Sequence, residues 1–320
     1  TVLLAQAAVA AEPPAVYVPE RVYDTRRNTF IDFEVMLAEL VRADVVLVGE
    51  QHHDPNTHRL ELALLGGLRR RRVPLTISFE MFERDVQRLV DQYLGGYLDE
   101  AQFLRDARPW PRYATDYRSL VELAKTYGWP VIASNVPRRL ASEVAKSGLA
   151  ALDALSSDDR ALAARELLCP QDTYFERFAK AMGTHANPDE KKSEVKKPEP
   201  DKPETGKPSD GGVGTDPAMT ERFYWAQCVK DETMAESIAR AFAARPGRNG
   251  AVVHFNGAFH SDFGLGAAER TRRRLPGRRV DVVSILPIVD LDALVPSAED
   301  LKRAEFLVYT IKSGQAPPSR

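Results

Sequence analysis

The chain has few cysteines, no long apolar run and almost no net charge. Only two cysteines, Cys169 and Cys228, occur among 320 residues. They are too few for a disulfide scaffold and lack the spacing of zinc ligands, and the sequence leaves open whether they pair. No apolar run reaches the roughly 18 residues of a membrane-spanning helix, and a formal charge of -2 argues against a dedicated nucleic-acid binder. With 43% apolar and 28% charged residues, the composition predicts a globular protein without a transmembrane segment.

The first residues resemble the end of an export signal. An apolar, alanine-rich stretch spans residues 3–11 and is followed by Pro13-Pro14. Such a stretch is typical of the tail of a secretory signal, although it would also suit the first turn of an ordinary helix. We therefore expect residues 1–15 to be the remnant of a secretory signal. The protein is then exported, to the periplasm or the cell surface.

A second segment has an unusual composition. Residues 187–216 consist largely of Lys, Glu, Asp and Pro with a glycine cluster, and they include no aromatic residue. Such a segment cannot bury enough apolar surface to offset the entropy lost on ordering it. We expect a disordered insertion there, between two helical stretches.

The rest of the chain alternates between short apolar runs and helical patterns. Five runs are continuous, as in strands that are covered on both faces, and they span 44–49, 75–79, 131–134, 251–255 and 280–285. One helix is expected to open at Asp54-Pro55, and others to cover about 116–127, 138–147, 158–168, 172–184, 219–244 and 265–274. This alternation predicts an α/β fold with a mostly parallel, doubly wound sheet.

The long gap between the third and fourth strands predicts a helical lid inserted into one α/β ligand-binding domain. The first half of the domain spans 16–136, the lid with its disordered insertion spans 137–249, and the second half with the C-terminal segment spans 250–320. In open parallel sheets, ligands bind outside the carboxyl ends of the strands. The polar residues at those ends are therefore the first candidates for a functional site.

Polar residues follow four of the predicted strands. Glu50 and His52 follow the first strand, Glu80 ends the second, Asn135 the third and His260 the fourth. Gly-x-x-His occurs after both the first and the fourth. Two imidazoles and two carboxylates suit a divalent metal, or general acid and base catalysis. Each residue also has a structural interpretation, since a Glu can cap a helix and a single His is usually packed in a core. The prediction depends on their convergence at one edge.

Four ordered segments resemble the motifs of one known family. The first, 48–59, reads Val-Gly-Glu-Gln-His-His-Asp-Pro-Asn-Thr-His-Arg, close to a Gly-Glu-x-His-Asp-Asn-Pro-x-His-His pattern. The others are Phe-Glu-Met-Phe at 79–82, Val-Ile-Ala-Ser-Asn-Val-Pro-Arg at 131–138, and a stretch from Tyr224 to His260 that ends in Asn-Gly-Ala-Phe-His. Over about residues 40–290, the chain resembles the ChaN-like haem-binding proteins. That family belongs to a wider superfamily with the Tiki metalloproteases and the erythromycin-esterase-like enzymes.

The first motif departs from the family pattern at three positions. His53 stands where the family has Asp, Asp54 where it has Asn, and Thr57 where it has the first of two adjacent histidines. His58 retains the second. The change at Thr57 affects any haem contact that depends on that histidine.

The resemblance implies non-covalent haem binding in bacterial haem and iron acquisition. The haem would lie between the carboxyl edge of the sheet and the helical lid, and the absence of a Cys-x-x-Cys-His motif agrees with non-covalent binding. Haem requires an apolar slot, an axial ligand and cations for its propionates. Tyr174 is the first choice as iron ligand, and the other candidate contacts are His185, His58, Tyr113, Arg138 and Asn135. The implied partners are haem, an outer-membrane haem-uptake system and a second copy of the chain in a homodimer.

The alternative is a metal-dependent hydrolase of the Tiki or erythromycin-esterase type. It would use Glu50, His52, Glu80 and His260, with His52 and His260 as ligands of a divalent metal. Only this function requires the strand-end cluster to be chemically active, and only haem binding requires a lid ligand and a flat apolar slot. The sequence favours the haem-binding protein over the enzyme.

Overall fold

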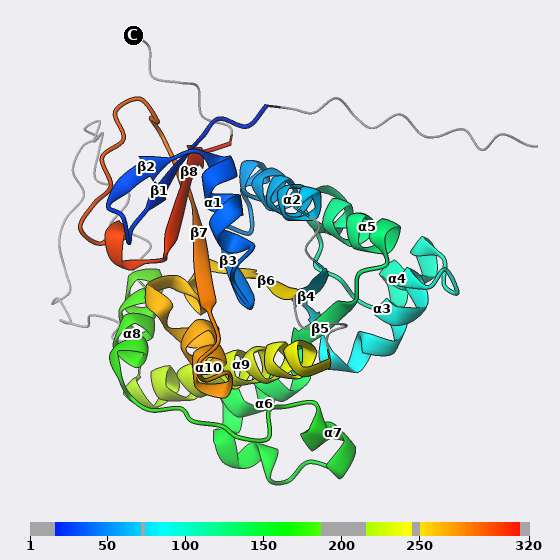
Figure 1. Cartoon of the computed structure of the whole chain (residues 1–320). Coiled ribbons are helices and arrows are strands. Elements are labelled where there is room, and N and C mark those ends of the chain that lie inside the picture. Colours follow the sequence, from blue (N-terminus) through cyan, green and yellow to red (C-terminus); the bar gives the residue numbers. More distant parts are fainter. Residues whose placement is uncertain (1–16, 72–73, 187–215, 245–249, 314–320) are drawn as a thin grey trace, which may run out of the picture.

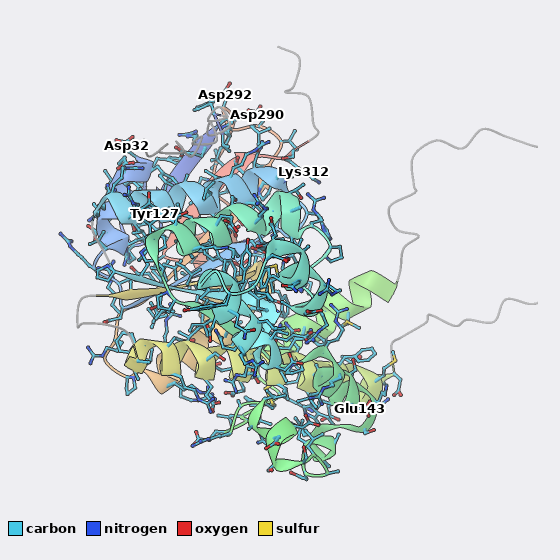
Figure 2. The ribbon with its side chains drawn as sticks, turned by 90° about the vertical axis from the view of Figure 1, so that its right-hand side faces the viewer. Asp32, Tyr127, Glu143, Asp290, Asp292 and Lys312 are labelled. Carbon is cyan, nitrogen blue, oxygen red and sulfur yellow. A yellow bond between two sulfur atoms is a disulfide. The ribbon has the colours of Figure 1, made fainter. Side chains whose placement is uncertain are left out.

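A computed structural model of the chain describes residues 17–71, 74–186, 216–244 and 250–313. The expected signal remnant at 1–15 and the expected insertion at 187–216, apart from its last residue, lie outside the described residues. Charged side chains such as those of Asp32, Glu143 and Lys312 lie on the outside of the molecule (Figure 2). None of the described helices has the length and apolarity needed to cross a bilayer.

An eight-stranded sheet forms the centre of the fold (Figure 1), with the order β2-β1-β8-β7-β3-β6-β4-β5. The strands are β1 (Glu20–Asp24), β2 (Thr29–Ile31), β3 (Val45–Glu50), β4 (Leu75–Glu83), β5 (Val131–Asn135), β6 (Ala251–Gly257), β7 (Val280–Ile288) and β8 (Phe306–Ile311). The six strands from β8 to β5 in this order are parallel. β1 and β2 extend one edge in antiparallel pairing.

The mostly parallel, doubly wound sheet expected from the sequence is confirmed. The five apolar runs are β3, β4, β5, β6 and β7. Three strands were not expected. β8 is itself a buried run, Phe-Leu-Val-Tyr-Thr-Ile, whereas β1 and β2 are short and mix charged with apolar residues. β1 is held between β8 and β2, and such pairing rather than propensity defines short edge strands.

Helices cover both faces of the sheet (Figure 1). They are α1 (Phe33–Leu40), α2 (Pro55–Arg70), α3 (Gln87–Leu94), α4 (Glu100–Asp106), α5 (Arg118–Tyr127), α6 (Arg138–Ser147), α7 (Ser157–Ala161), α8 (Thr173–Ala186), α9 (Pro217–Ala244) and α10 (Gly266–Arg274). Side chains of a strand alternate between faces. In β3, Val46 and Val48 therefore join the core under α1 to α5, while Val45 and Leu47 pack with α9 and α10.

The local signals at the start of α2 explain its position. The Asp54 carboxylate accepts hydrogen bonds from the backbone N–H groups of Asn56 and Thr57, at 2.9 and 3.2 Å, and Pro55 occupies the first helical position. The helix therefore begins where the sequence predicts. By contrast, α1, α3 and α4 were not expected, and the helix expected at 158–168 is the much shorter α7. These helices have at most eight residues, too few for a clear 3.6-residue pattern.

The segment between β5 and β6 contains α6 to α9 but is not a simple lid. α9 packs on one face of the sheet through Met234, Ile238 and Phe242, and α6 packs on the N-terminal half of α9. α8 is the part that borders the carboxyl edge, where Tyr174 and Arg177 line a pocket. The segment thus supplies one layer of the fold, and only α8 has the position expected of a lid.

Candidate functional site

β3 and β6 are neighbours in the sheet, and each continues into a Gly-x-x-His segment at the carboxyl edge. Both glycines allow a close approach. A Cβ atom on Gly257 would lie 2.6 Å from His52 Nε2, and one on Gly49 would lie 2.9 Å from Ser261 Oγ. Any larger residue would push the two segments apart. The spacing therefore brings the histidines of both segments to the same place.

Glu50 anchors the first polar pair of the site. Its Oε1 atom lies 2.6 Å from His52 Nδ1 and accepts a hydrogen bond from the Tyr117 hydroxyl. Glu50 and Tyr117 are buried, whereas the His52 side chain is 37% exposed. The ring of Trp110 packs edge-on against the imidazole, with the ring centres 4.8 Å apart. Glu50 therefore orients an imidazole that remains accessible from outside.

Glu80 and His260 form a second pair that extends into the helical layer. His260 Nε2 lies 3.2 Å from Glu80 Oε1, and His260 Nδ1 lies 2.6 Å from Asp231 Oδ1. The Tyr174 hydroxyl donates to the other oxygen of Asp231 at 2.8 Å. The backbone N–H of Gly257 donates to Glu80 Oε2 at 2.8 Å. A continuous chain of buried polar groups therefore runs from β4 to α8.

The partners in these pairs shift each other's pKa in opposite directions. Burial alone would lower the pKa of His260, but Glu80 and Asp231 raise it to about 10. Burial alone would raise the pKa of Glu80, but His260 holds it below its usual range. Burial also opposes the charge on His52, but Glu50 raises its pKa. The Glu80–His260 pair is therefore charged at neutral pH.

A pocket of about 370 Å³ opens beside both pairs, and His52 lies in its wall. Phe259, Phe263 and Leu265 give it an apolar side. Arg177 of α8 and Arg303 give it two guanidinium groups, and the Arg177 guanidinium lies 3.4 Å from the centre of the Phe263 ring. One pocket thus combines an imidazole, an apolar wall and two cations.

The structure brings together the four strand-end residues predicted from the sequence, Glu50, His52, Glu80 and His260. Three of them line the pocket, and Glu80 lies behind His260. Asn135 is buried beside them, and its amide donates to the backbone carbonyl of Glu80 at 3.1 Å. The chemical roles of these residues stay predictions.

The predicted haem contacts are less well placed. Tyr174 borders the pocket, but its side chain is buried and its hydroxyl is bound to Asp231. His58 and Tyr113 are buried, and Arg138 is exposed at the start of α6; none of these three lines the pocket. His58 lies on the other side of Glu50, with its Nδ1 atom 3.9 Å from Glu50 Oε2. The side chain of His185, in the last turn of α8, lies outside the described residues.

Sequence reasoning did not predict the contacts of several residues that complete the site. Tyr117 closes a π-helical turn, η2 (Tyr113–Tyr117), and such turns are frequent at functional sites but have no sequence signature. Asp231 lies on the buried side of α9, where an acidic residue among apolar ones was a usable signal. Arg177 follows Tyr174 by three residues, so helical spacing places both on one side of α8.

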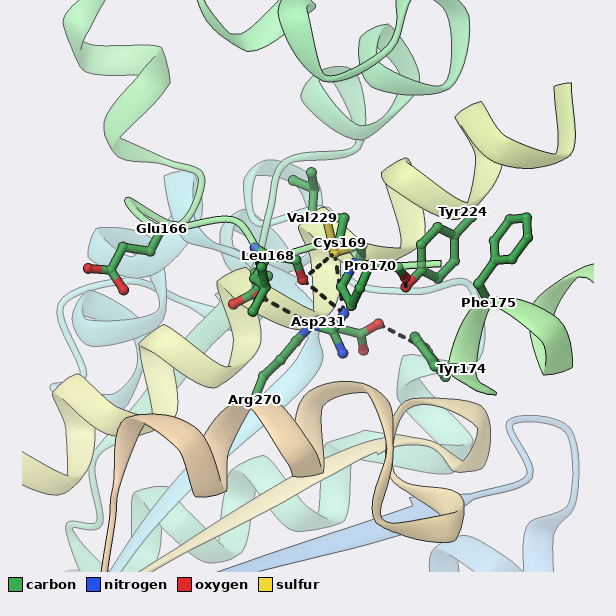
Figure 3. Close-up of a disulfide and its surroundings, with 12 residues drawn as sticks. Glu166, Leu168, Cys169, Pro170, Tyr174, Phe175, Tyr224, Val229, Asp231 and Arg270 are labelled. Atoms are coloured by element: carbon green, nitrogen blue, oxygen red, sulfur yellow. Dashed lines mark hydrogen bonds and ion pairs between the residues drawn. A yellow bond between two sulfur atoms is a disulfide. The ribbon is translucent and has the colours of Figure 1, made fainter. Parts of the chain in front are cut away.

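A disulfide joins Cys169 to Cys228 and links the segment that precedes α8 to α9 (Figure 3). This settles the pairing that the sequence left open. Cys228 precedes Asp231 by three residues on α9, and Figure 3 shows the bond from the Tyr174 hydroxyl to Asp231 beside the disulfide. The cross-link therefore fixes the segment that brings α8 to the pocket.

Comparisons with known proteins agree with this architecture. The profile of a family described as "Haem-binding uptake, Tiki superfamily, ChaN" matches residues 36–271. A solved structure described as "Cofacial heme binding to ChaN of Campylobacter jejuni" superposes with a TM-score of 0.63 at 15% identity, over 91% of this chain and 96% of that chain. At that identity, the similarity shows a shared fold.

Two other solved structures are more distant. The type III effector HopBA1 has a TM-score of 0.44 at 10% identity, over 94% of this chain and 99% of its own. An erythromycin esterase in its open conformation has a TM-score of 0.43 at 13% identity, over 92% of this chain and 83% of its own. No curated protein matches the sequence significantly.

Proposed function

Because this chain belongs to the haem-binding uptake family of ChaN, in the Tiki superfamily, we propose that it binds haem without a covalent bond in the pocket at the carboxyl edge of the sheet. One observation carries the proposal. The pocket combines an accessible imidazole, an apolar wall and two guanidinium groups, and these are the three features that haem requires of a protein.

The apolar wall is suited to one face of a flat macrocycle. Phe259 packs against Tyr174 and Phe178, with ring centres 5.3 and 6.1 Å apart, so its ring is held from behind. Phe263 and Leu265 continue the same wall. Aromatic side chains that are already packed lose little freedom when a ligand covers them. The wall therefore supports haem binding without rearrangement of the core.

Arg177 is the better candidate for a propionate contact. Its ion-pair partner in the structure is Glu299, at 3.2 Å, and that carboxylate is 63% exposed. Exposed pairs contribute only about 0–1 kcal/mol, so Arg177 can exchange this partner for a propionate at little cost. Arg303 instead pairs with Asp262 at 2.7 Å and with Asp300 at 2.8 Å. It is better suited to hold the pocket wall.

His52 is the better-placed iron ligand. Its Nδ1 is bound to Glu50, which leaves Nε2 as the coordinating atom. Tyr174, the first choice from the sequence, has a side chain that is only 1% exposed. Burial and the nearby Asp231 carboxylate raise the pKa of Tyr174 well above 10, and the phenolate that would bind ferric iron is correspondingly disfavoured. Iron coordination by Tyr174 stays a prediction, and it requires the hydrogen bond from the Tyr174 hydroxyl to Asp231 to break.

A hemin titration followed at the Soret band tests both parts of the proposal. Wild-type protein should show a saturable Soret shift. His52→Ala should weaken binding at least about tenfold, because coordination exceeds an ordinary hydrogen bond in strength. His53→Ala is the matched control, since it removes an exposed histidine from the same loop that does not line the pocket. Tyr174→Phe should change the spectrum little.

Three results would change these assignments. A spectrum lost in Tyr174→Phe and retained in His52→Ala would restore Tyr174 as the ligand. Equal losses in His52→Ala and His53→Ala would indicate haem adsorbed on the surface. Absence of any Soret change in wild-type protein would refute the carrier function.

A metal-dependent hydrolase is the second candidate. It is favoured by the Glu50–His52 pair and the Glu80–His260–Asp231 chain, which face the same pocket edge and could provide a base and a charged acid. In that case, added divalent metal produces hydrolytic activity, His52→Ala abolishes it, and Tyr174→Phe has no effect. Hydrolysis without hemin binding would select this function over the carrier.

We also propose that the protein works outside the cytoplasm, in bacterial iron acquisition. The Cys169–Cys228 disulfide supports this, because disulfides persist in oxidising compartments. An outer-membrane haem-uptake system and a second copy of the chain remain the proposed partners. Cell fractionation and growth on haem as the iron source test the location and the role. Protein found in the cytoplasm with two free thiols would contradict both.

A further inference from the structure

A second group of polar side chains lies deeper than the pocket, on the other side of Glu50. One ligand atom from each of Glu50, His58 and Glu61 lies within 4.8 Å of the others. All three side chains are buried. His58 and Glu61 are one turn apart on α2, and His58 Nδ1 lies 2.9 Å from Glu61 Oε2 and 3.9 Å from Glu50 Oε2. Glu50 also lines the haem pocket, whereas His58 and Glu61 do not.

Two carboxylate oxygens in this group have no hydrogen-bond partner among the residues that the structure describes. They are Glu50 Oε2 and Glu61 Oε1, both fully buried. Among the ion pairs of the described residues, neither glutamate contacts a lysine or an arginine. A buried carboxylate oxygen without a partner is costly. A positively charged group between the two glutamates would therefore stabilise this arrangement.

The orientation of His58 favours a metal ion in that position. His58 Nε2 lies 3.2 Å from the backbone carbonyl oxygen of His52. A carbonyl only accepts, so Nε2 carries the proton, and in the neutral ring Nδ1 is a bare lone pair directed at two carboxylates. Histidines that bind metals usually donate their other N–H to a carbonyl or carboxylate in this way.

We propose that Glu50, His58 and Glu61 bind a divalent transition-metal ion of the zinc class. A tetrahedral ion with bonds of about 2.1 Å holds its ligand atoms about 3.4 Å apart, and the two separations from His58 Nδ1, 2.9 and 3.9 Å, lie on either side of that value. One imidazole with two carboxylates suits such an ion better than Mg²⁺, which prefers oxygen ligands and retained waters. Two carboxylates also balance its charge.

The proposed site has a second layer and a route to the surface. Tyr117 donates to Glu50, and Asp116 lies 3.6 Å from His58 Nε2 and pairs with Arg112. A pocket of about 670 Å³ reaches His58 and Asp116 from outside, between α2 and η2. The ion would therefore enter by a different pocket from haem. It would also hold Glu50 and the His52 carbonyl in place, which links it to the loop that carries His52.

A proton is the competing occupant. Burial and the charge of Glu50 raise the pKa of Glu61 well above its usual value when no ion is present. A protonated Glu61 could then share its hydrogen with Glu50, and no metal would bind. The two occupants differ in a measurable way, because only the metal ion adds stability when it is supplied.

Chelator-stripped, untagged protein is titrated with Zn²⁺ by calorimetry, in the absence of haem. Wild-type protein should bind one ion with micromolar or tighter affinity and unfold at a higher temperature when loaded, while equimolar Mg²⁺ should have no effect. Glu61→Gln keeps the shape of the side chain, removes one charge and should weaken binding at least about 100-fold. Glu80→Gln is the matched control, since Glu80 is also buried but belongs to the His260 pair, and it should bind Zn²⁺ as wild type does.

Three outcomes would overturn the proposal. They are no Zn²⁺ binding by wild-type protein, loss of binding in Glu80→Gln with retention in Glu61→Gln, and equal loss in both. If Glu61→Gln fails to fold, anomalous diffraction at the zinc edge from Zn²⁺-soaked wild-type crystals decides without any variant. A peak between Glu50, His58 and Glu61 supports the site. A peak at His260, or none, refutes it. Because these experiments contain no haem, a negative result refutes the metal site and leaves the haem-binding proposal to be tested by the hemin titration.

Discussion

Removing the Cys169–Cys228 disulfide should destabilise the protein by an amount that follows from its place in the chain. The bond closes a loop with a sequence separation of 59. In the chain-entropy description, a loop of that size contributes about 4 kcal/mol to the free energy of unfolding. With an unfolding entropy of about 2.1 cal/mol/K per residue, this corresponds to a fall in Tm of about 6 °C for a chain of this size.

The stability lost on removing the disulfide should be concentrated near the pocket. α9 also packs on the sheet through Met234 and Ile238, so it keeps most of its support. The segment before α8 depends more on the cross-link, which lies close to the bond between Tyr174 and Asp231. Reduction should therefore speed amide hydrogen exchange in α8 more than in α2, and it should weaken hemin binding through displacement of Arg177.

The assay compares wild-type protein with a Cys169→Ala/Cys228→Ala double variant, with and without reductant. Reductant should lower the Tm of wild-type protein to nearly that of the double variant and leave the variant unchanged. A thiol count of two after treatment verifies reduction. The reasoning fails if fully reduced wild-type protein keeps its original Tm. It also fails if untreated, denatured protein already has two free thiols, since then no disulfide existed.

Two further predictions concern helix packing and pH. Gly66→Ala should raise the free energy of unfolding by about 0.5–1 kcal/mol, because a Cβ atom there would meet none of the described residues within 4 Å and alanine favours helix. Gly67→Ala should instead lower the free energy of unfolding by about 1–3 kcal/mol, because its Cβ atom would lie 2.2 Å from Leu37 Cδ1 in the core. Urea unfolding of the two variants measures both effects. Equal effects would refute the packing of Gly67 against Leu37. The folded-state pKa of His260 is raised to about 10, so its stabilisation is complete below its unfolded pKa, about 6.5, and is lost as pH rises through 10. The stability difference between wild type and His260→Gln should shrink across that window by at most about 1.4 kcal/mol per pH unit, and a difference independent of pH would contradict the charged Glu80–His260 pair.

The fold was predictable where one strong pattern decided the structure. Continuous apolar runs identify β3 to β7, because each of these strands is covered on both faces and tolerates few polar residues. Asp54-Pro55 fixes the start of α2 through hydrogen bonds within four residues of chain. β1 and β2 lack such a local cause. They are strands because β8 offers an edge to pair with, and an edge formed about 280 residues later is invisible in a local window.

The same distinction explains which parts of the site were found. Strand-end residues converge whatever their separation in sequence, since parallel pairing brings the ends of β3, β4 and β6 to one edge. Glu50, Glu80 and His260 could therefore be grouped before the structure was known. Residues supplied by helices depend on how each helix is rotated about its axis, which side-chain packing determines. Tyr117 reaches Glu50 because η2 widens the helix by a π-turn, and Asp231 reaches His260 because the apolar side of α9 is directed at the sheet.

The proposed metal site combines both kinds of position, which is why it escaped a search by strand ends. Glu50 comes from the end of β3, whereas His58 and Glu61 come from α2, with the i,i+3 spacing that places two side chains on one helix face. That face also carries Leu60, Leu64 and Leu68 on adjoining positions and is buried against the sheet. A histidine and a glutamate one turn apart on a buried helix face cannot both be solvated, so each needs a partner inside the protein. Because β3 leads directly into α2, the nearest available partner is the carboxylate at the end of that strand. A buried His-x-x-Glu at the start of a helix, after a strand that ends in Glu, is therefore a pattern that sequence analysis can use to propose an internal cation site.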